Sequence, residues 1–296
     1  MKKAYIKYIA ALILFGFNGI VAHHISLTSY EIVFFRTMIG SFLLMIIFFL
    51  NKGKCYFIQY KKQFFFLVVS GVAMGVSWMF LYEAYRQVGI SIASLAYYCG
   101  PVIVMVLSPV IFRERLTYTK IIGFLAVLVG VFLVNGQVVD NGTHVRGLFF
   151  GSMSAIMYAI MVIFNKKAKD ITGLEKSMLQ LFISFLTVSI FIAYKQALVI
   201  RIPATDVIPI LVLGLLNTGL GCYLYFSSIG DLPVQTVALC GYLEPLSAVV
   251  FSVIILKENL LIVQVVGATL IIGGAFFGEL FMIGSKRNIQ KQHSSI

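Results

Sequence analysis

The chain has 296 residues, of which 60% are hydrophobic and only 11% are charged. A soluble domain carries roughly 25% charged residues, so the composition excludes a soluble protein and predicts a chain embedded in lipid, where hydrocarbon solvates an apolar exterior. The net charge of +12 could suggest nucleic-acid binding. The Lys and Arg residues, however, lie at the ends of apolar segments, as in membrane proteins whose topology they set. We therefore expect the lipid bilayer, and no nucleic acid, as a partner.

Apolar runs separated by short polar connections predict ten membrane-spanning helices, because crossing a hydrocarbon core of about 30 Å takes roughly 20 residues. The positively charged start is interpreted as a retained first helix and not as a signal peptide, since no small-residue cleavage site stands out. Helices of this length use nearly the whole chain. They are expected at residues 5–24, 31–50, 64–85, 91–112, 119–136, 147–165, 176–194, 207–228, 234–256 and 260–283.

The distribution of Lys and Arg predicts the orientation. Positive residues are frequent in every second connection, for example around Lys52, Arg113 and Lys166, and sparse in the alternate ones. Cytoplasmic connections carry the excess of positive charge. We therefore expect a multi-pass protein of the cytoplasmic membrane with both termini in the cytoplasm.

The second half of the chain repeats the first when the sequence is shifted by 144 residues. Each half carries five predicted helices, an odd number, so the second half must enter the membrane in the opposite direction. The expected fold is an all-α integral membrane protein with ten transmembrane helices in two inverted five-helix repeats, which supports alternating access to a central site. The coinciding pairs include Glu31 and Glu175, Tyr98 and Tyr242, Pro101 and Pro245, Glu114 and Glu258, Gly123 and Gly267, and Gly130 and Gly274.

Two stretches resemble the repeat signature of the EamA family of drug/metabolite transporters. They are Tyr97-Tyr98-Cys99-Gly100-Pro101 continuing to Phe112-Arg113-Glu114-Arg115-Leu116, and Tyr242-Leu243-Glu244-Pro245 continuing to Lys257-Glu258-Asn259-Leu260. The resemblance covers about residues 5–283. It implies a first EamA-like repeat at residues 1–138, a second at 145–284, and a cytoplasmic tail at 285–296. It further implies secondary transport of a small-molecule substrate without a metal or cofactor, and peripheral fifth and tenth segments that could form a homodimer contact.

Charged side chains inside a span cost about 2.5–3.5 kcal/mol at mid-bilayer on insertion scales, so each needs a partner, water or a function. Glu244 precedes Pro245, which frees a backbone carbonyl, and this combination suits a central cavity. The alternative is a hydrogen bond from Glu244 to a neighbouring helix. Glu83 lies among aromatic residues, where it could bind a cation or pair with Arg86 one turn away. Arg36 could bind a substrate carboxylate, pair with a glutamate (Glu83 or Glu31), or extend to the surface.

Aromatic and amide side chains complete the candidate substrate-binding site. Tyr98 and Tyr242 lie one turn before Pro101 and Pro245, which are interpreted as kinks that could act as hinges. Tyrosine combines an apolar ring with a hydroxyl and suits metabolites of mixed polarity, although Tyr and Trp also mark membrane interfaces. The other candidates are Trp78, Tyr82, Tyr158, Tyr223 and the polar Asn18 of the first helix.

Two groups of matched residues are expected to be structural. Glu114 and Glu258 lie at turns, where a carboxylate stabilises the N-terminus of the following helix. Small residues should let helices approach closely. These are Gly123, Gly130, Gly267, Gly273 and Gly274.

The leading hypothesis is a secondary carrier for an amino acid, amine or related solute, with a coupling proton or a counter-substrate left open. Arg36 and Arg86 are too few cations for a phosphate-rich substrate such as a nucleotide sugar. A membrane-embedded enzyme and a passive channel are the alternatives. No catalytic residue or metal site is expected, because the cysteines lack metal-ligand spacing and no histidine lies deep within a span, His23 and His24 being at the outer end of the first one. The four histidines are His23, His24, His144 and His293.

Overall fold

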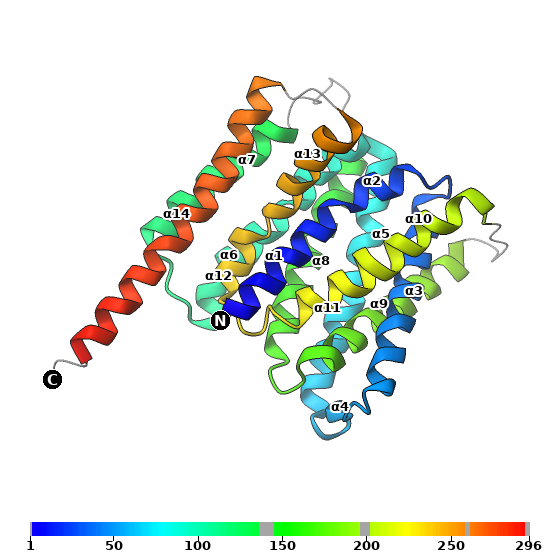
Figure 1. The fold of residues 1–296 in the computed structure, drawn as a ribbon, viewed down its shortest axis with the longest axis horizontal. Helices are drawn as coiled ribbons and strands as arrows, with labels where there is room; N and C mark the ends of the chain where they lie inside the picture. Colours follow the sequence, from blue (N-terminus) through cyan, green and yellow to red (C-terminus); the bar gives the residue numbers. More distant parts are fainter. Residues whose placement is uncertain (1, 136–144, 196–201, 258–260, 294–296) are drawn as a thin grey trace.

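A computed structural model describes residues 2–135, 145–195, 202–257 and 261–293, and within these ranges the fold is helical (Figure 1). The elements of the first half are α1 (Lys2–Gly16), α2 (Asn18–His23), α3 (Ser29–Leu50), α4 (Tyr56–Gln59), α5 (Lys61–Tyr97), α6 (Cys99–Phe112) and α7 (Tyr118–Asn135). Those of the second half are α8 (Val145–Lys167), α9 (Gly173–Lys195), η2 (Ala204–Asp206), α10 (Val207–Val212), the π-helix η3 (Leu213–Leu220), α11 (Gly221–Phe226), α12 (Val234–Cys240), α13 (Leu243–Leu256) and α14 (Ile262–His293).

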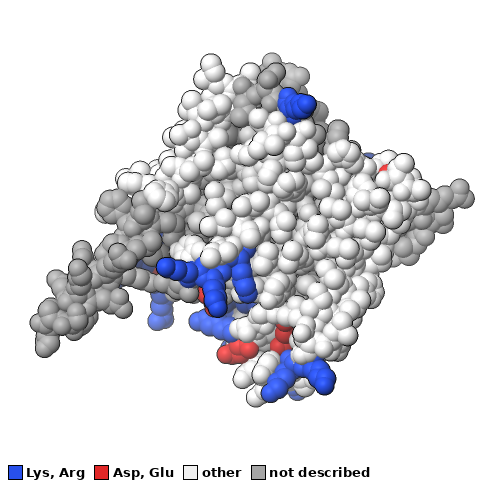
Figure 2. Space-filling model, viewed as in Figure 1, with Lys and Arg blue, Asp and Glu red and all other residues white. Residues whose placement is uncertain are grey.

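Among the described residues, seven stretches are long and apolar enough to cross a membrane. They are Lys2–Ala22, Ser29–Leu50, Lys61–Val88, Val145–Lys167, Gly173–Tyr194, Ala204–Phe226 and Val234–Ile255, and shorter apolar helices occupy Cys99–Phe112, Tyr118–Leu133 and Ile262–Gly278. The visible surface is largely uncharged, and most of its Lys and Arg side chains gather at one end (Figure 2). The chain is therefore a multi-pass membrane protein, and three of the ten predicted spans correspond to apolar stretches that are shorter than a full membrane crossing.

Helix α5 is longer than one span because the chain reverses direction within it. A Cβ on Gly147 of α8 would lie against the Val88 side chain. One on Gly151 would lie 3.9 Å from Ala84 and 2.7 Å from Ala96. The chain therefore passes α8 in one direction up to Val88 and returns along it by Ala96. This reversal accounts for the two separate segments that hydropathy predicts in this region.

The bounds of several helices are separated by the same 144 residues as the sequence repeat. Helices α6 and α13 have 14 residues each, and α3 and α9, like α7 and α14, begin 144 residues apart. Directly after α6 and α13, Arg113 and Lys257 have positive φ angles of 57° and 54°. Non-glycine residues adopt this conformation infrequently. The chain thus takes the same left-handed turn at matched positions.

Helices α7 and α14 pack against each other through glycines at one edge of the bundle (Figure 1). A Cβ on Gly123 would lie 2.5 Å from the carbonyl oxygen of Gly274, and one on Gly130 would lie 2.6 Å from that of Gly267. The order of these contacts shows that the two helices are antiparallel. Small residues allow the close backbone approach that holds helices together in lipid, as expected for these positions.

We expect Gly274→Ala to lower the thermal stability of the purified protein, because the added methyl group would lie 2.5 Å from the Gly123 carbonyl oxygen. Overpacking of this kind costs about 1–3 kcal/mol. The matched control is Gly273→Ala, since nothing lies within 4 Å of a Cβ at that position. Unfolding in detergent should show a lower midpoint for G274A and an unchanged or slightly higher one for G273A. Equal midpoints would contradict the contact.

Candidate functional site

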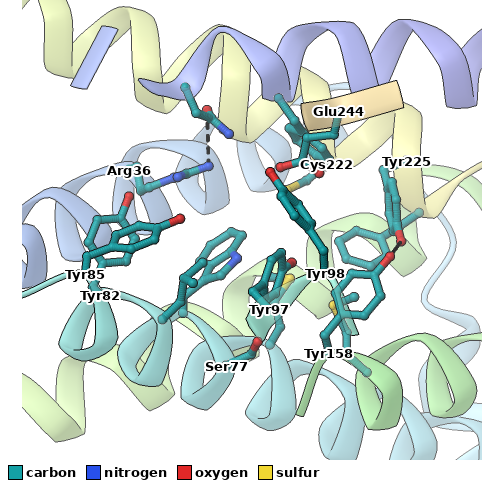
Figure 3. Close-up of a pocket in the computed structure, with 17 residues that line it drawn as sticks. Arg36, Ser77, Tyr82, Tyr85, Tyr97, Tyr98, Tyr158, Cys222, Tyr225 and Glu244 are labelled. Carbon is teal, nitrogen blue, oxygen red and sulfur yellow. Dashed lines mark hydrogen bonds between the residues drawn. The ribbon is translucent and has the colours of Figure 1, made fainter. Parts of the chain in front are cut away.

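A cavity of about 130 Å³ lies between helices from both halves of the chain. Its wall is rich in tyrosine and contains one cationic and one anionic side chain, Arg36 and Glu244 (Figure 3). Phe15, Asn18, Arg36, Met74, Ser77, Trp78, Leu81, Tyr82, Tyr85, Tyr97, Tyr98, Tyr158, Met161, Cys222, Tyr225, Phe226 and Glu244 line it. A mostly apolar pocket with a few convergent polar groups is typical of a small-molecule site.

Interruptions of the helices place several of these residues at the cavity. Helix α1 ends just before Asn18, α5 ends just before Tyr98, and α12 and α13 are separated by a turn that contains Tyr242. Side chains from distant parts of the chain bond the carbonyls near two of the breaks: Asn217 donates to the Leu14 carbonyl at 3.1 Å, and Tyr242 donates to the Tyr98 carbonyl at 2.7 Å. Non-helical backbone at membrane depth is tolerated where it is buried in protein or lines a cavity.

Pro101 and Pro245 are each the third residue of a short helix, α6 and α13. In the first turn of a helix the missing N–H of proline would have no intrahelical partner. Each proline therefore follows a complete interruption and does not kink a continuous helix, in contrast to the sequence interpretation. Glu244 consequently lies in the first turn of α13, where the helix N-terminus stabilises a carboxylate. A hinge role for the two prolines stays a prediction.

Arg36 is held at the cavity by neutral partners, and its side chain is only 5% exposed. Its Nε donates to Thr218 Oγ1 at 2.9 Å, and its Nη2 donates to Asn18 Oδ1 at 3.5 Å (Figure 3). The guanidinium carbon lies 4.7 Å from the centre of the Trp78 ring, close enough for a cation–π interaction. Within the described part of the chain no carboxylate lies within 4 Å of the guanidinium. The glutamate pairing that the sequence left open is therefore not observed.

Aromatic side chains pack tightly on one side of the cavity, around Tyr8 of α1. The Tyr225 ring lies 5.3 Å from that of Tyr8, and its hydroxyl oxygen lies 3.2 Å from the Tyr158 hydroxyl oxygen (Figure 3). Tyr8 is fully buried and Tyr225 is 4% exposed. The Tyr8 and Tyr225 rings thus pack against each other next to the cavity.

The Glu114 side chain links the loop after α6 to the N-terminus of α12. Its carboxylate accepts the N–H groups of Val234 and Gln235 at 2.8 and 3.2 Å, and Lys120 donates to the Gln235 side chain at 2.7 Å. Glu114 therefore stabilises the N-terminus of α12. The sequence predicted that Glu114 stabilises the N-terminus of the following helix, α7. That prediction was wrong, because the loop after α6 folds toward the second half of the chain. Its counterpart Glu258 lies outside the described residues.

Three candidate site residues lie away from the cavity wall. Tyr242 is fully buried behind it, with its ring 6.4 Å from that of Tyr98. Glu83 lies 3.7 Å from Arg86, the pairing that the sequence offered as the alternative to cation binding. The Tyr223 ring lies 5.3 Å from the Lys7 ammonium group.

The structure brings the other sequence candidates together around the cavity. These are Asn18, Arg36, Trp78, Tyr82, Tyr98, Tyr158 and Glu244. Sequence reasoning missed the lining residues Phe15, Met74, Ser77, Leu81, Tyr85, Tyr97, Met161, Cys222, Tyr225 and Phe226. It also missed Thr218, the partner of Arg36, although two adjacent polar residues (Asn217 and Thr218) within an apolar run were a detectable signal.

Comparison with known proteins decides the family. Residues 2–136 and 145–278 match the model of the EamA-like transporter family. The chain belongs to this family. The match confirms the resemblance inferred from the repeat signature, and it agrees with a transporter in preference to an enzyme.

Relatives of this EamA-like protein have similar lengths. Two Bacillus subtilis proteins described as uncharacterized transporters, YxxF and YetK, are 22% and 30% identical to it. The alignments cover 92% and 79% of the chain and 88% and 73% of those proteins. The uncharacterized transporter PM1281 of Pasteurella multocida is 26% identical over 68% of the chain and 67% of its own length. A solved crystal structure with 14% identity superposes with a TM-score of 0.80, covering 94% of the chain and 98% of its own, which shows a shared fold.

We expect Thr218→Val to destabilise the protein, because the buried Arg36 Nε loses its acceptor at 2.9 Å. Leaving such a group unsatisfied costs about 1–3 kcal/mol, and more for a charged one. Thr37→Val is the matched control, because Thr37 is also fully buried. Both hydroxyls donate to a carbonyl of their own helix, but that of Thr218 also accepts from Arg36. A lower unfolding midpoint for T218V alone is the expected result, and similar shifts for both variants would argue against a structural role of this bond.

Proposed function

We propose that this EamA-like protein is a secondary transporter that moves an amino acid, amine or related small solute across the cytoplasmic membrane by alternating access. The cavity carries the proposal, because it joins charged, hydroxyl and aromatic groups from both halves in the middle of a membrane-embedded bundle. Its volume of about 130 Å³ is similar to the roughly 150 Å³ of an engineered cavity that admits benzene. Pockets for drug-sized ligands measure about 300–1,000 Å³. A small metabolite therefore fits best.

The proposed architecture is ten transmembrane helices in two inverted five-helix repeats, residues 1–138 and 145–284, followed by a cytoplasmic tail at 285–296. The glycine contacts of α7 and α14 support it. Under the 144-residue shift the Gly123–Gly274 contact becomes the Gly267–Gly130 contact, and a reciprocal contact of this kind is what a twofold axis produces. Because the two helices are antiparallel, the axis lies in the membrane plane, as in inverted-repeat transporters.

The two matched tyrosines suggest how the halves exchange conformations. The Tyr242 hydroxyl donates to the Tyr98 carbonyl, whereas Tyr98 lines the cavity. In a cycle in which the repeats exchange shapes, the opposite state has the Tyr98 hydroxyl on the Tyr242 carbonyl. In the proposed orientation the tightly packed rings of Tyr8 and Tyr225 lie toward the cytoplasm, which favours a state closed on that side. Coupling to a proton or counter-substrate, and a homodimer, remain predictions.

We expect Glu244→Gln to reduce transport at least tenfold while the protein stays folded in the membrane, because it removes the anionic group of the cavity. The measurement is saturable uptake and counterflow of labelled neutral amino acids and primary amines in proteoliposomes. Glu83→Gln is the control, since this carboxylate lies outside the cavity wall. A wild-type rate for E244Q would remove Glu244 from the site. Unsaturable flux without counterflow would favour a passive channel.

Cysteine labelling tests the inverted repeats and the orientation. In a background without native cysteines, Arg115→Cys should react with an impermeant thiol reagent only from the cytoplasmic side, and Lys257→Cys only from the opposite side. Lys54→Cys serves as a second cytoplasmic marker, because its connection is rich in lysine. Labelling of positions 115 and 257 from one side would refute the inverted arrangement.

A further inference from the structure

The cavity holds one cation and one anion that are not paired with each other. Arg36 and Glu244 both line it and reach it from different helices, α3 and α13 (Figure 3). Among the described residues Glu83 and Arg86 form an ion pair, whereas no carboxylate lies within 4 Å of the Arg36 guanidinium. Opposite charges in a shared low-dielectric cavity attract strongly. In this structure the two side chains nevertheless form no ion pair with each other.

The Arg36 guanidinium is anchored by its own surroundings. Thr218 and Asn18 hold it by hydrogen bonds, and the Trp78 ring supports it from one face. It therefore cannot move to Glu244 without breaking these contacts. The hydrogen bonds involve two of its nitrogens, and a guanidinium is a planar fork suited to a carboxylate. Glu244 lies in the first turn of α13, where the helix N-terminus favours negative charge.

The sequence repeat shows that each half supplies one charge. The residue 144 positions after Arg36 is Gln180, and the residue 144 positions before Glu244 is Gly100. Gln180 has a neutral side chain, which is buried and hydrogen-bonded to Asn165. The cavity is thus electrically bipolar, with a positive and a negative side.

We propose, building on the transporter function above, that the substrate is a small zwitterion whose carboxylate binds Arg36 and whose cationic group binds at Glu244. Tyr98 lies beside Glu244 in the cavity wall, which Tyr97 also lines (Figure 3), and aromatic faces stabilise a cation further. A cargo with charges of both signs satisfies both side chains at once. An amine or an acid of the same size leaves one of them unsatisfied. Arg36 and Glu244 are then the residues that determine specificity.

Matched sets of solutes test the proposal. Each set contains a neutral amino acid no larger than leucine, the amine formed by removing its carboxyl group, and the acid formed by removing its amino group. Competition for uptake into proteoliposomes containing the full chain should show at least one amino acid that binds ten or more times tighter than both of its analogues. An analogue that binds as tightly as its parent, or no saturable uptake of any neutral amino acid, would overturn the zwitterion. Saturable uptake of an amine or acid alone would leave the transporter function intact.

Two variants assign the two ends of the substrate. In Arg36→Gln the amino acid should lose its tenfold advantage over the amine, and in Glu244→Gln its advantage over the acid. The readout is a ratio of affinities, so a reduced amount of folded protein does not change it, and binding can be followed by thermal stabilisation if transport is lost. Arg86→Gln is the control, because this arginine is 59% exposed and lies outside the cavity wall. Unchanged ratios in R36Q and E244Q would refute the assignment.

Discussion

The structure depends on a constraint that the bilayer imposes: a backbone carbonyl or N–H freed at membrane depth must find a partner inside the protein. The helices break beside the cavity, near Asn18, Tyr98 and Tyr242. Side chains from distant parts of the chain bond the carbonyls near two of these breaks, as Asn217 does for Leu14 and Tyr242 for Tyr98. These side-chain bonds form only in the assembled bundle, which is also where the polar cavity forms.

The position of Arg36 follows from a related departure from regular helix. Asn217 and Thr218 belong to the π-helix η3, a form that is rare and often found at functional sites. Thr218 accepts from Arg36 and itself donates to the Leu213 carbonyl, while Asn217 donates to Asn18 Oδ1, which Arg36 also contacts. One irregular turn thus supports the buried cation through two neighbouring side chains.

Much of the fold could be predicted from the sequence, because a helix that crosses lipid needs a long apolar run whatever its tertiary contacts are. Arg36 and Glu244 could be found because charged groups are conspicuous in such runs. Tyr85 and Tyr225 could not, since a tyrosine that faces a cavity and one that faces a neighbouring helix have similar local sequences. The interruption of the helix before Pro101 could likewise not be predicted from the sequence. Whether a chain bends at a proline or stops before it is decided by contacts from elsewhere in the fold.

The two halves of the chain carry different residues at the matched positions that supply the charges of the cavity. Arg36 has Gln180 as its repeat counterpart, and Glu244 has Gly100. A dimer of two first halves would place two guanidinium groups at the cavity. A dimer of two second halves would place two carboxylates there. In a dimer of identical chains two matched positions must carry the same residue, whereas in a single polypeptide they can differ. One chain can therefore place opposite charges on the two sides of the same cavity.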